Sequence, residues 1–208
     1  MNTAFILEAA EAINQAIINS EAEIESLDRE IGDGDHFINM KRGCATIVNM
    51  REELAPLSTD AALNKIGMKL LSTIGGASGP LFASFFIAMS KALKEQNDES
   101  ITSLAYAFEA GVESIASRGK AGLGEKTMLD VLIPVAKKFK TLAAHQNSKV
   151  IAQKLPQLAL DGVLATKYMI ATKGRAAGLG ERAIGHIDPG AKSCQVMIST
   201  VCNLIANQ

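Results

Sequence analysis

Residues 191–206, AKSCQVMISTVCNLIA, decide the fold class of this chain. They carry apolar side chains at steps of three and four residues, which is the spacing of one face of an α-helix. That face consists of Cys194, Met197, Ile198, Val201 and Ile205. Strands require an alternation of apolar and polar residues, and runs of alternating valine, isoleucine and threonine are missing from the 208 residues. The sequence therefore predicts an all-α protein.

The same spacing recurs along the rest of the chain and predicts seven further helices. They are expected from Ile6 to Leu27, from Met40 to Leu54, and over residues 61–74, 81–94, 102–118, 127–143 and 150–172. Pro134 and Pro156 fall inside two of them, and because proline removes a backbone donor we expect a kink at each. No internal repeat and no linker rich in proline or serine divides the chain, so residues 1–208 are expected to form a single domain.

Charge and hydropathy exclude two classes of partner. The 21 Lys+Arg are balanced by 22 Asp+Glu, so the net charge of -1 offers no basic field for nucleic acid or an anionic membrane surface. The longest apolar stretch, around residues 81–89, is far shorter than the ~18 residues that span a bilayer. We therefore expect neither a nucleic-acid partner nor a membrane.

The cysteines and the N-terminal residues indicate the cellular compartment of the protein. Cys44, Cys194 and Cys202 form no CxxC motif, so we expect reduced, mostly buried thiols. Glu8 and Glu11 stand where a secretory signal would have a basic segment followed by an apolar run. The sequence thus predicts the cytoplasm as the location.

Glycine is concentrated in four of the predicted loops. Such loops permit close backbone approach and positive φ angles, and they can aim N–H groups at an anion. In an up-and-down arrangement of eight helices these are the first, third, fifth and seventh connections, which lie at the same end. We therefore expect one composite site at one rim. The clusters contain 13 of the 17 glycines: Gly32 and Gly34; Gly75, Gly76 and Gly79; Gly119, Gly122 and Gly124; and Gly174, Gly178, Gly180, Gly185 and Gly190.

The first glycine loop, LDREIGDGDH at residues 27–36, contains three aspartates. Asp28, Asp33 and Asp35 would repel one another unless a cation lay among them, and hard oxygen ligands without cysteine suit Mg²⁺ or Ca²⁺. A calcium-binding EF-hand is excluded, because neither Asp33 nor Asp35 begins the required pattern ending in glutamate. An aspartate-rich helix cap and turn is the alternative.

The second and third glycine loops suggest anion binding. GGASGP at residues 75–80 leads into a predicted helix, whose first amides and dipole would stabilise a phosphate; a tight turn capped by Ser78 is the alternative. GKAGLGEKT at residues 119–127 comes close to a Walker A loop, but Glu125 interrupts the pattern and a helix precedes it instead of a strand. We expect helix-start amides at Gly119 and a nearby Lys126 to favour an anion there, the alternative for Lys126 being a solvated lysine.

The seventh connection, residues 173–190, is long, glycine-spaced and charged, which is typical of functional loops. Arg175 could bind a phosphate through two parallel hydrogen bonds, a geometry that lysine does not provide. His36 and His186 flank the expected rim, and each is more often a hydrogen-bond donor in a turn than a catalytic base.

Taken together, the four loops resemble one family, the nucleotide-binding L subunits of dihydroxyacetone kinases, and in particular the ADP-binding subunits of its phosphotransferase-dependent branch. Each motif is unspecific alone, but the four occur in order over nearly the whole chain. The matching pieces are LDREIGDGDH (27–36) with Asn39-Met40, residues 75–82, Gly119-Lys120 with KTM (126–128) and Asp130, and Gly174-Arg175 with residues 179–185 and DPG (188–190).

This resemblance implies an antiparallel eight-helix barrel that holds ADP or ATP with two Mg²⁺ at its rim. By residue match, Asp28, Asp33 and Asp35 would be the metal ligands and, with Arg175, the catalytic set. The nucleotide contacts would be His36, Phe37, Ile38, Asn39, Ala77, Ser78, Gly119, Met128, Arg175, Asp188, Pro189 and Gly190. The sequence departs from the family at Phe37, where glycine is usual, and at Gly178, where an aromatic residue is usual.

The resemblance also implies partners. Dihydroxyacetone would be bound on a separate K subunit, and an M subunit of the phosphotransferase system would recharge the nucleotide; a homodimer is possible. Three alternatives stay open: an ATP-consuming ketose kinase subunit, a regulatory docking module loaded with Mg-ADP, and a helical bundle whose glycine loops bind nothing. The partner subunit would determine which ketose is the acceptor.

Overall fold

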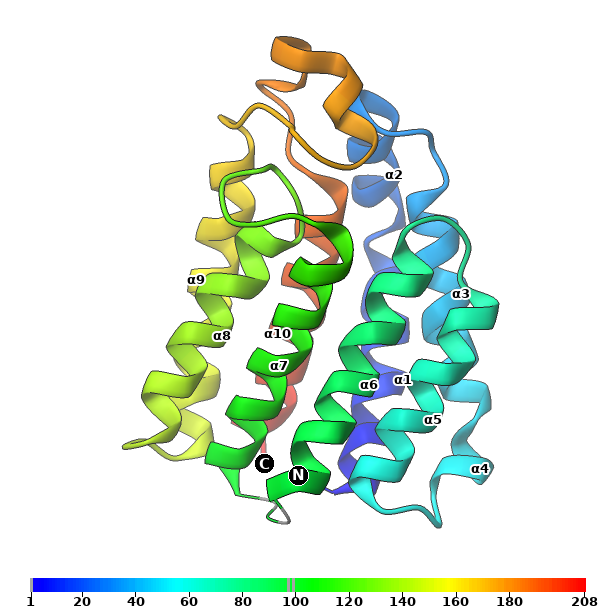
Figure 1. Cartoon of the computed structure of the whole chain (residues 1–208), viewed down its shortest axis with the longest axis vertical. Coiled ribbons are helices and arrows are strands. Elements are labelled where there is room, and N and C mark those ends of the chain that lie inside the picture. The colour runs from blue at the N-terminus through cyan, green and yellow to red at the C-terminus, as the bar shows by residue number, and fades with distance from the viewer. Residues whose placement is uncertain (1, 97, 99) are drawn as a thin grey trace.

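The computed structural model of the chain describes residues 2–96, 98 and 100–208. Within these ranges the chain forms ten α-helices and one 3₁₀-helix and no β-strand, which confirms the all-α prediction (Figure 1). The elements are α1 (Thr3–Asn19), α2 (Glu21–Ile31), α3 (His36–Asn49), α4 (Arg51–Leu54), α5 (Thr59–Thr73), α6 (Ser78–Gln96), α7 (Ile101–Gly119), α8 (Leu129–Ala143), α9 (Ser148–Thr166), η1 (Arg175–Ala183) and α10 (Pro189–Ala206).

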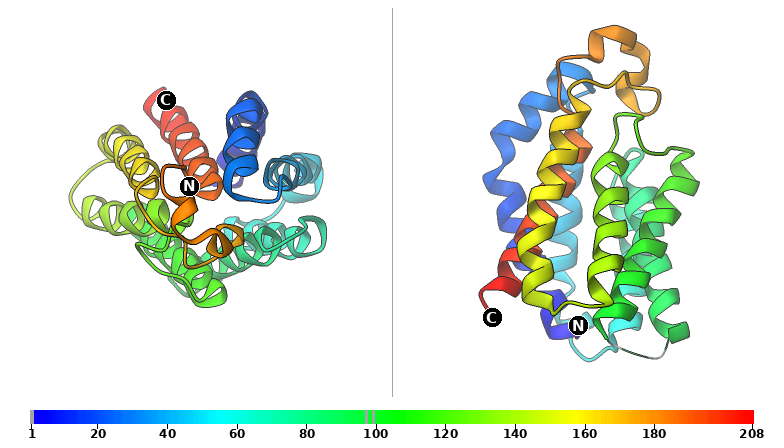
Figure 2. Two further views of the ribbon diagram at one scale, coloured as in Figure 1. Left: turned by 90° about the horizontal axis from the view of Figure 1, so that it is seen from above. Right: turned by 90° about the vertical axis from the view of Figure 1, so that its left-hand side faces the viewer.

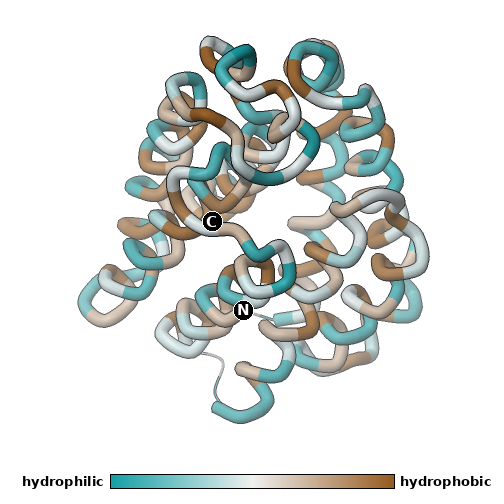
Figure 3. Tube along the Cα trace, turned by 45° about the horizontal axis from the view of Figure 1, so that its top comes forward, coloured by the Kyte–Doolittle hydropathy of each residue, from teal (hydrophilic) through white to brown (hydrophobic). Residues whose placement is uncertain are grey.

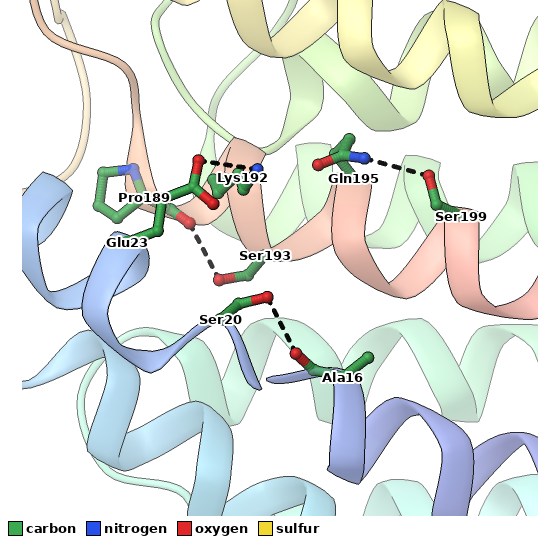
Figure 4. A network of polar contacts seen from close by, with 8 residues as sticks. All are labelled: Ala16, Ser20, Glu23, Pro189, Lys192, Ser193, Gln195 and Ser199. Carbon is green, nitrogen blue, oxygen red and sulfur yellow. Dashed lines mark hydrogen bonds and ion pairs between the residues drawn. The ribbon is translucent and has the colours of Figure 1, made fainter. Parts of the chain in front are cut away.

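Two of the predicted helices are broken in the structure. The first divides into α1 and α2 at Ser20, whose hydroxyl donates to the Ala16 carbonyl at 2.9 Å and competes with the helical hydrogen bonds (Figure 4). The second divides at Met50, where ψ is 5°. Other helix ends also differ from the prediction. The helix α3 begins at His36 instead of Met40 and α6 at Ser78 instead of 81, while α8 begins at Leu129 instead of 127 and α9 ends at Thr166 instead of 172.

Eight of the helices form a closed circuit of neighbours. Each of α3, α5, α6, α7, α8 and α9 packs against the next, and α10 contacts both α9 and α1, which returns to α3. Figure 2 shows this arrangement from above, with η1 lying across one end. The helix α2 extends beyond the circuit and contacts η1 and α10.

All four glycine loops lie at the end of the circuit that is uppermost in Figure 1, and both chain termini lie at the other end. The loops join α2 to α3, α5 to α6, α7 to α8 and α9 to α10. The predicted clustering at one rim is therefore confirmed.

The interior is apolar. Hydrophobic and hydrophilic positions both recur along the helices, as Figure 3 shows. The buried apolar side chains form one large core to which every helix of the circuit contributes. A largely apolar pocket of about 910 Å³ extends into this core and is lined, among others, by Ile13, Phe82, Phe108 and Met197. In the described ranges no helix has the length and apolarity needed to cross a membrane.

The predictions for the cysteines and the prolines have different outcomes. Cys44, Cys194 and Cys202 are free and buried, as expected, and burial raises the pKa of the Cys44 thiol to about 12 and that of Cys202 to about 11. The helix α8 continues through Pro134 and α9 through Pro156. The kink expected at each proline stays a prediction.

Candidate functional site at the glycine-rich rim

The three aspartates of the first loop converge. Asp28 lies in the last turn of α2 and is buried, whereas Asp33 and Asp35 are exposed in the loop that follows, and oxygen atoms of all three lie within 4.8 Å of one another. The Asp28 carboxylate accepts a hydrogen bond of 3.0 Å from the His36 N–H, which folds the loop back on α2. A Cβ at position 32 would lie 1.8 Å from an oxygen of the Asp28 carboxylate, so any residue larger than glycine at this position would displace that carboxylate.

The surroundings of Asp35 disfavour the charged form of its carboxyl group. The pKa of Asp35 is raised by desolvation first, and then by its hydrogen bond with Asp33 and by the charges of Asp33 and Asp28, while a hydrogen bond with Asn39 opposes the shift. A divalent cation among the three oxygens would remove this repulsion. The donor set, carboxylate oxygens without sulfur, fits Mg²⁺, so the cluster fits the metal that the family resemblance implies.

Arg175 joins this cluster from the far end of the sequence. It is the first residue of η1, and its Nε lies 2.7 Å from Asp33 Oδ2 while most of its side chain is exposed. The predicted phosphate ligand and the predicted metal ligands are thus neighbours. An arginine at this place can contact an anion bound beside the carboxylates.

The first turn of α3 contains four predicted nucleotide contacts with different environments. Ile38 is 53% exposed, whereas Asn39 is buried and approaches Gly75 of the second loop. Phe37 is 2% exposed and its ring belongs to the core, so only its backbone faces the rim. Phe37 replaces the family's usual glycine without placing a side chain in the site.

His36 connects α3 to α10. Its Nε2 lies 2.8 Å from the hydroxyl of Ser193. Figure 4 shows that this hydroxyl itself donates to the Pro189 carbonyl, at 3.0 Å. Because the serine proton is used in that bond, Nε2 is the donor to the serine oxygen. Burial lowers the pKa of His36, although the charges of Asp28 and Asp35 oppose the shift. The ring therefore joins α3 to the start of α10.

The second loop lies against the aspartates. A Cβ at Gly76, where φ is +63°, would lie 3.8 Å from Asp35 Oδ2 and 3.7 Å from the Asn39 amide nitrogen. Ala77 follows, and Ser78 begins α6 at the rim. The first amides of this 19-residue helix thus start close to the carboxylate cluster, as the sequence predicts.

The third loop differs from its prediction in two respects. Gly119 is the last residue of α7, so it lies at a helix end and not at a helix start. Lys126 is 1% exposed, and its ammonium group donates to the carbonyl oxygens of Thr166 and His186. Lys126 is therefore neither a solvated cation nor a side chain extended toward an anion. The sequence did not reveal this, because its acceptors lie 40 and 60 residues away.

Asp188, Pro189 and Gly190 form the start of α10. Asp188 caps the helix by accepting from the Ala191 N–H at 2.7 Å, and its own N–H donates to Thr166 Oγ1 at 3.1 Å. Desolvation raises the pKa of Asp188 to about 7, against the effects of the Ala191 hydrogen bond and the Lys126 charge. A Cβ at Gly190 would lie 3.7 Å from that of Met128, so the structure brings these two predicted nucleotide segments together.

The fourth loop covers part of the rim through η1. Ala171, Ala176 and Ala183 form a small apolar cluster with Ile31 of α2, and His186 Nδ1 lies 3.4 Å from Glu30 Oε2. A Cβ at Gly178 would meet no atom within 4 Å, so space exists for the aromatic residue usual in the family.

Several residues that organise the rim were not singled out from the sequence. Thr166 and Ser193 are fully buried. Thr166 joins the third and fourth loops to α9, and Ser193 joins the His36 ring of α3 to the start of α10. Asp130, which appeared only as part of a motif, accepts from the N–H groups of Gly124 and Thr127 and shapes the third loop. No local pattern marks Thr166 or Ser193, because the contacts of Thr166 with Lys126 and Asp188 and of Ser193 with His36 link residues that are distant in sequence.

Fold and site define a class: an all-α protein that gathers three carboxylates, an arginine and a helix start on one rim. The DAK2 domain family matches residues 30–203, and the chain belongs to this family.

Similar proteins agree with this assignment. The chain is 41% identical over 184 residues, 88% of each chain, to the PEP-dependent dihydroxyacetone kinase, ADP-binding subunit DhaL, of Escherichia coli (strain K12). It is also 41% identical over 193 residues, 93% of each chain, to the PTS-dependent counterpart from Lactococcus lactis subsp. lactis (strain IL1403). With the triokinase/FMN cyclase of Mus musculus the identity is 30% over 194 residues, which are 92% of this chain and 33% of that protein.

A solved structure shares the fold. It is the crystal structure of the dihydroxyacetone kinase from C. freundii in complex with AMP-PNP and Mg²⁺, with a TM-score of 0.75 and 24% identity. The similarity covers 97% of this chain and 34% of that chain.

Proposed function

We propose that this chain is the nucleotide-binding subunit of a dihydroxyacetone kinase, formed by residues 1–208 as one domain. It would hold ADP or ATP with two Mg²⁺ and transfer the phosphoryl group to dihydroxyacetone bound on a partner K subunit. The observation that carries the proposal is the meeting of Asp28, Asp33 and Asp35 with Arg175 at the rim where the glycine loops gather.

The residues of the chain have distinct roles in this proposal. Asp28, Asp33 and Asp35 would hold the metal ions, with Asp28 oriented by the His36 N–H. Bound magnesium supplies neutralisation of the charge that develops on a phosphoryl group in transfer. Arg175 would contact phosphate oxygens and add electrostatic stabilisation. No nucleophile is needed from this chain, because the attacking hydroxyl belongs to the acceptor.

The remaining predicted contacts would surround the nucleotide. They lie on the first turn of α3, at the start of α6, at the end of α7 and on the paired segments at Met128 and Asp188–Gly190. The start of α6 offers backbone N–H groups to phosphates, and the Phe37 position contributes backbone only. Gly119 would contribute through the backbone at the end of α7.

The proposed phosphoryl donor is a phosphoprotein, the M subunit of the phosphotransferase system. The support is the higher identity, 41% against 30%, to relatives named PEP- or PTS-dependent than to the triokinase. An ATP-consuming ketose kinase is the second candidate, because the triokinase still matches 92% of this chain. The proposed location is the cytoplasm, where the three free thiols would stay reduced.

A reconstitution tests the proposal. The purified chain is combined with K and M subunits of the Escherichia coli enzyme, the general phosphotransferase proteins, phosphoenolpyruvate, Mg²⁺ and dihydroxyacetone, and dihydroxyacetone phosphate is measured. We expect product that depends on this chain and on the M subunit. Product formed from ATP without the M subunit would favour the second candidate. Binding of Mg-ADP without any transfer would favour a regulatory module.

A further inference from the structure

Lys126 is a buried cation at the junction of three rim segments. Its side chain is 1% exposed, although lysine is almost never fully buried without partners. The ammonium group donates to the Thr166 carbonyl at the end of α9 and to the His186 carbonyl just before α10. One side chain of the third loop is thereby bonded to both ends of the fourth connection.

The backbone at Lys126 is also unusual. Its φ is +60°, in the left-handed region that side chains other than glycine rarely adopt. Asp130 holds this conformation from the next helix by accepting from the N–H groups of Gly124 and Thr127, on both sides of the lysine. The loop conformation therefore directs the Lys126 side chain into the protein, toward the Thr166 and His186 carbonyl groups.

The segments bonded to Lys126 carry predicted nucleotide contacts. Met128 follows it by two residues, and Asp188–Gly190 begins two residues after His186. These segments touch where a Cβ on Gly190 would lie 3.7 Å from the Met128 Cβ. Thr166 completes the junction, since its hydroxyl accepts from the Asp188 N–H at 3.1 Å while its carbonyl accepts from Lys126.

The charges around Lys126 also stabilise its buried ammonium group. Asp130 and Asp188 both act on Lys126, and they favour its charged form against the desolvation that lowers its pKa. Removal of the ammonium would leave two buried carbonyls without these donors and Asp188 without its nearby cation.

We propose that Lys126 is a positioning residue, which holds the Met128 segment and the Asp188–Gly190 segment in the relative placement needed to bind the nucleotide. The inference rests on the proposed function. Lys126 acts through the two carbonyl oxygens and needs no contact with the nucleotide itself.

The test compares Lys126→Met with two control variants. Lys138→Met makes the same change at an exposed lysine of α8. Leu155→Ala removes core packing at a buried position of α9 far from the rim, and so reports general destabilisation. Mg-ADP dissociation constants are measured by calorimetry well below the Tm of every variant. Amide hydrogen exchange is followed over residues 185–191.

We expect Lys126→Met to raise the Kd of Mg-ADP at least about tenfold, which a lost charged hydrogen bond can account for. Exchange over residues 185–191 should become faster, while both controls keep the wild-type Kd within about twofold. A Lys126→Met Kd no higher than that of Leu155→Ala would overturn the proposal.

Two further results are distinguishable. If the wild type binds no Mg-ADP, the proposed function fails. The positioning role of Lys126 is then tested by amide exchange alone, and equal exchange rates at residues 185–191 in Lys126→Met and Leu155→Ala would overturn it. If Lys126→Met does not fold, nitrogen-15 spectra of the wild type decide. A slowly exchanging Lys126 ammonium coupled to the Thr166 and His186 carbonyl carbons supports the proposal, and its absence contradicts it.

Discussion

At the scale of single residues, Asp35 gives the clearest test of the metal ligands. Its carboxylate lies with those of Asp28 and Asp33 and has a raised pKa because of burial and its neighbours. Asp35→Asn keeps the shape and removes the charge. We expect phosphoryl transfer in the reconstituted system to fall by at least about a hundredfold, because metal-ion stabilisation of the transition state is worth several kcal/mol.

The control for this variant is Asp161→Asn, at an exposed aspartate of α9. Both variants should keep the helical circular dichroism of the wild type. An Asp35→Asn protein that transfers phosphoryl groups at the wild-type rate would remove the aspartates from the proposed mechanism.

Asp188 makes stability depend on pH. Burial raises its pKa from 3.8 to about 7, so between these values the folded protein binds more protons than the unfolded chain. The stability from this group is therefore full below pH 3.8 and is lost as the pH rises through about 7. The slope is at most about 1.4 kcal/mol per pH unit.

Asp188→Asn isolates this effect, because an asparagine oxygen can still accept from the Ala191 N–H and cap α10. The unfolding free energy of nucleotide-free protein is measured by urea denaturation from pH 5 to pH 8. We expect the wild type to lose stability relative to Asp188→Asn as the pH rises. Parallel profiles for the two proteins would show that Asp188 does not titrate in this range.

Residue identity alone predicted some roles and not others. The acidic motif at residues 27–36 indicated a cluster correctly, because its members are close in sequence and a short loop must bring them together. The environment of Lys126 was predicted wrongly, because its hydrogen-bond acceptors, the carbonyl groups of Thr166 and His186, are distant in sequence and no local pattern indicates them. Whether the aspartates hold metal stays a prediction.

At the scale of elements, η1 depends on one glycine. Gly180 has φ of 57° and ψ of -129° inside this segment, a conformation that strains any other residue by about 1–3 kcal/mol. We expect Gly180→Ala to loosen η1 and to speed amide exchange over residues 175–183. Gly178→Ala is the matched control, because a Cβ there meets nothing within 4 Å and its φ is not positive. Equal exchange in both variants would contradict this account of η1.

The contact between α8 and α9 depends on a second glycine. A Cβ at Gly162 would lie 2.6 Å from the Asp130 carbonyl oxygen and 3.1 Å from the Val131 Cα, and backbone atoms cannot rotate away. Overpacking by Gly162→Ala should cost about 1–3 kcal/mol, against the ~1 kcal/mol that alanine gains over glycine in a helix, so we expect a net loss of stability of up to about 2 kcal/mol. Thermal unfolding measures the change, and a Tm at or above that of the wild type would show that the two helices can separate freely.

Helix content was predictable, and helix ends were less so. The apolar periodicity located all eight helices of the circuit, but the break at Ser20 has no glycine or proline to signal it. The 3₁₀ segment η1 was expected only as a glycine-rich loop, because its stability comes from contacts with Ile31 of α2 instead of local pattern. Tertiary contacts decided these details.

At the scale of the whole molecule, chain topology creates the site. Alternate connections of an up-and-down arrangement share one end, so four loops distant in sequence meet above the core. The rim carries the carboxylates, Arg175 and the start of α6, while the opposite end carries the termini. This division was predictable from the order of the glycine clusters, whereas the bonds between loops were not.

The central claim is that this rim holds a nucleotide, and one measurement tests it most directly. The protein is purified in Mg²⁺, desalted and denatured, and any released nucleotide is identified by chromatography. The account predicts about one ADP per chain, retained through desalting as a bound coenzyme. A protein that carries no nucleotide and binds neither ADP nor ATP when they are added with Mg²⁺ would contradict it.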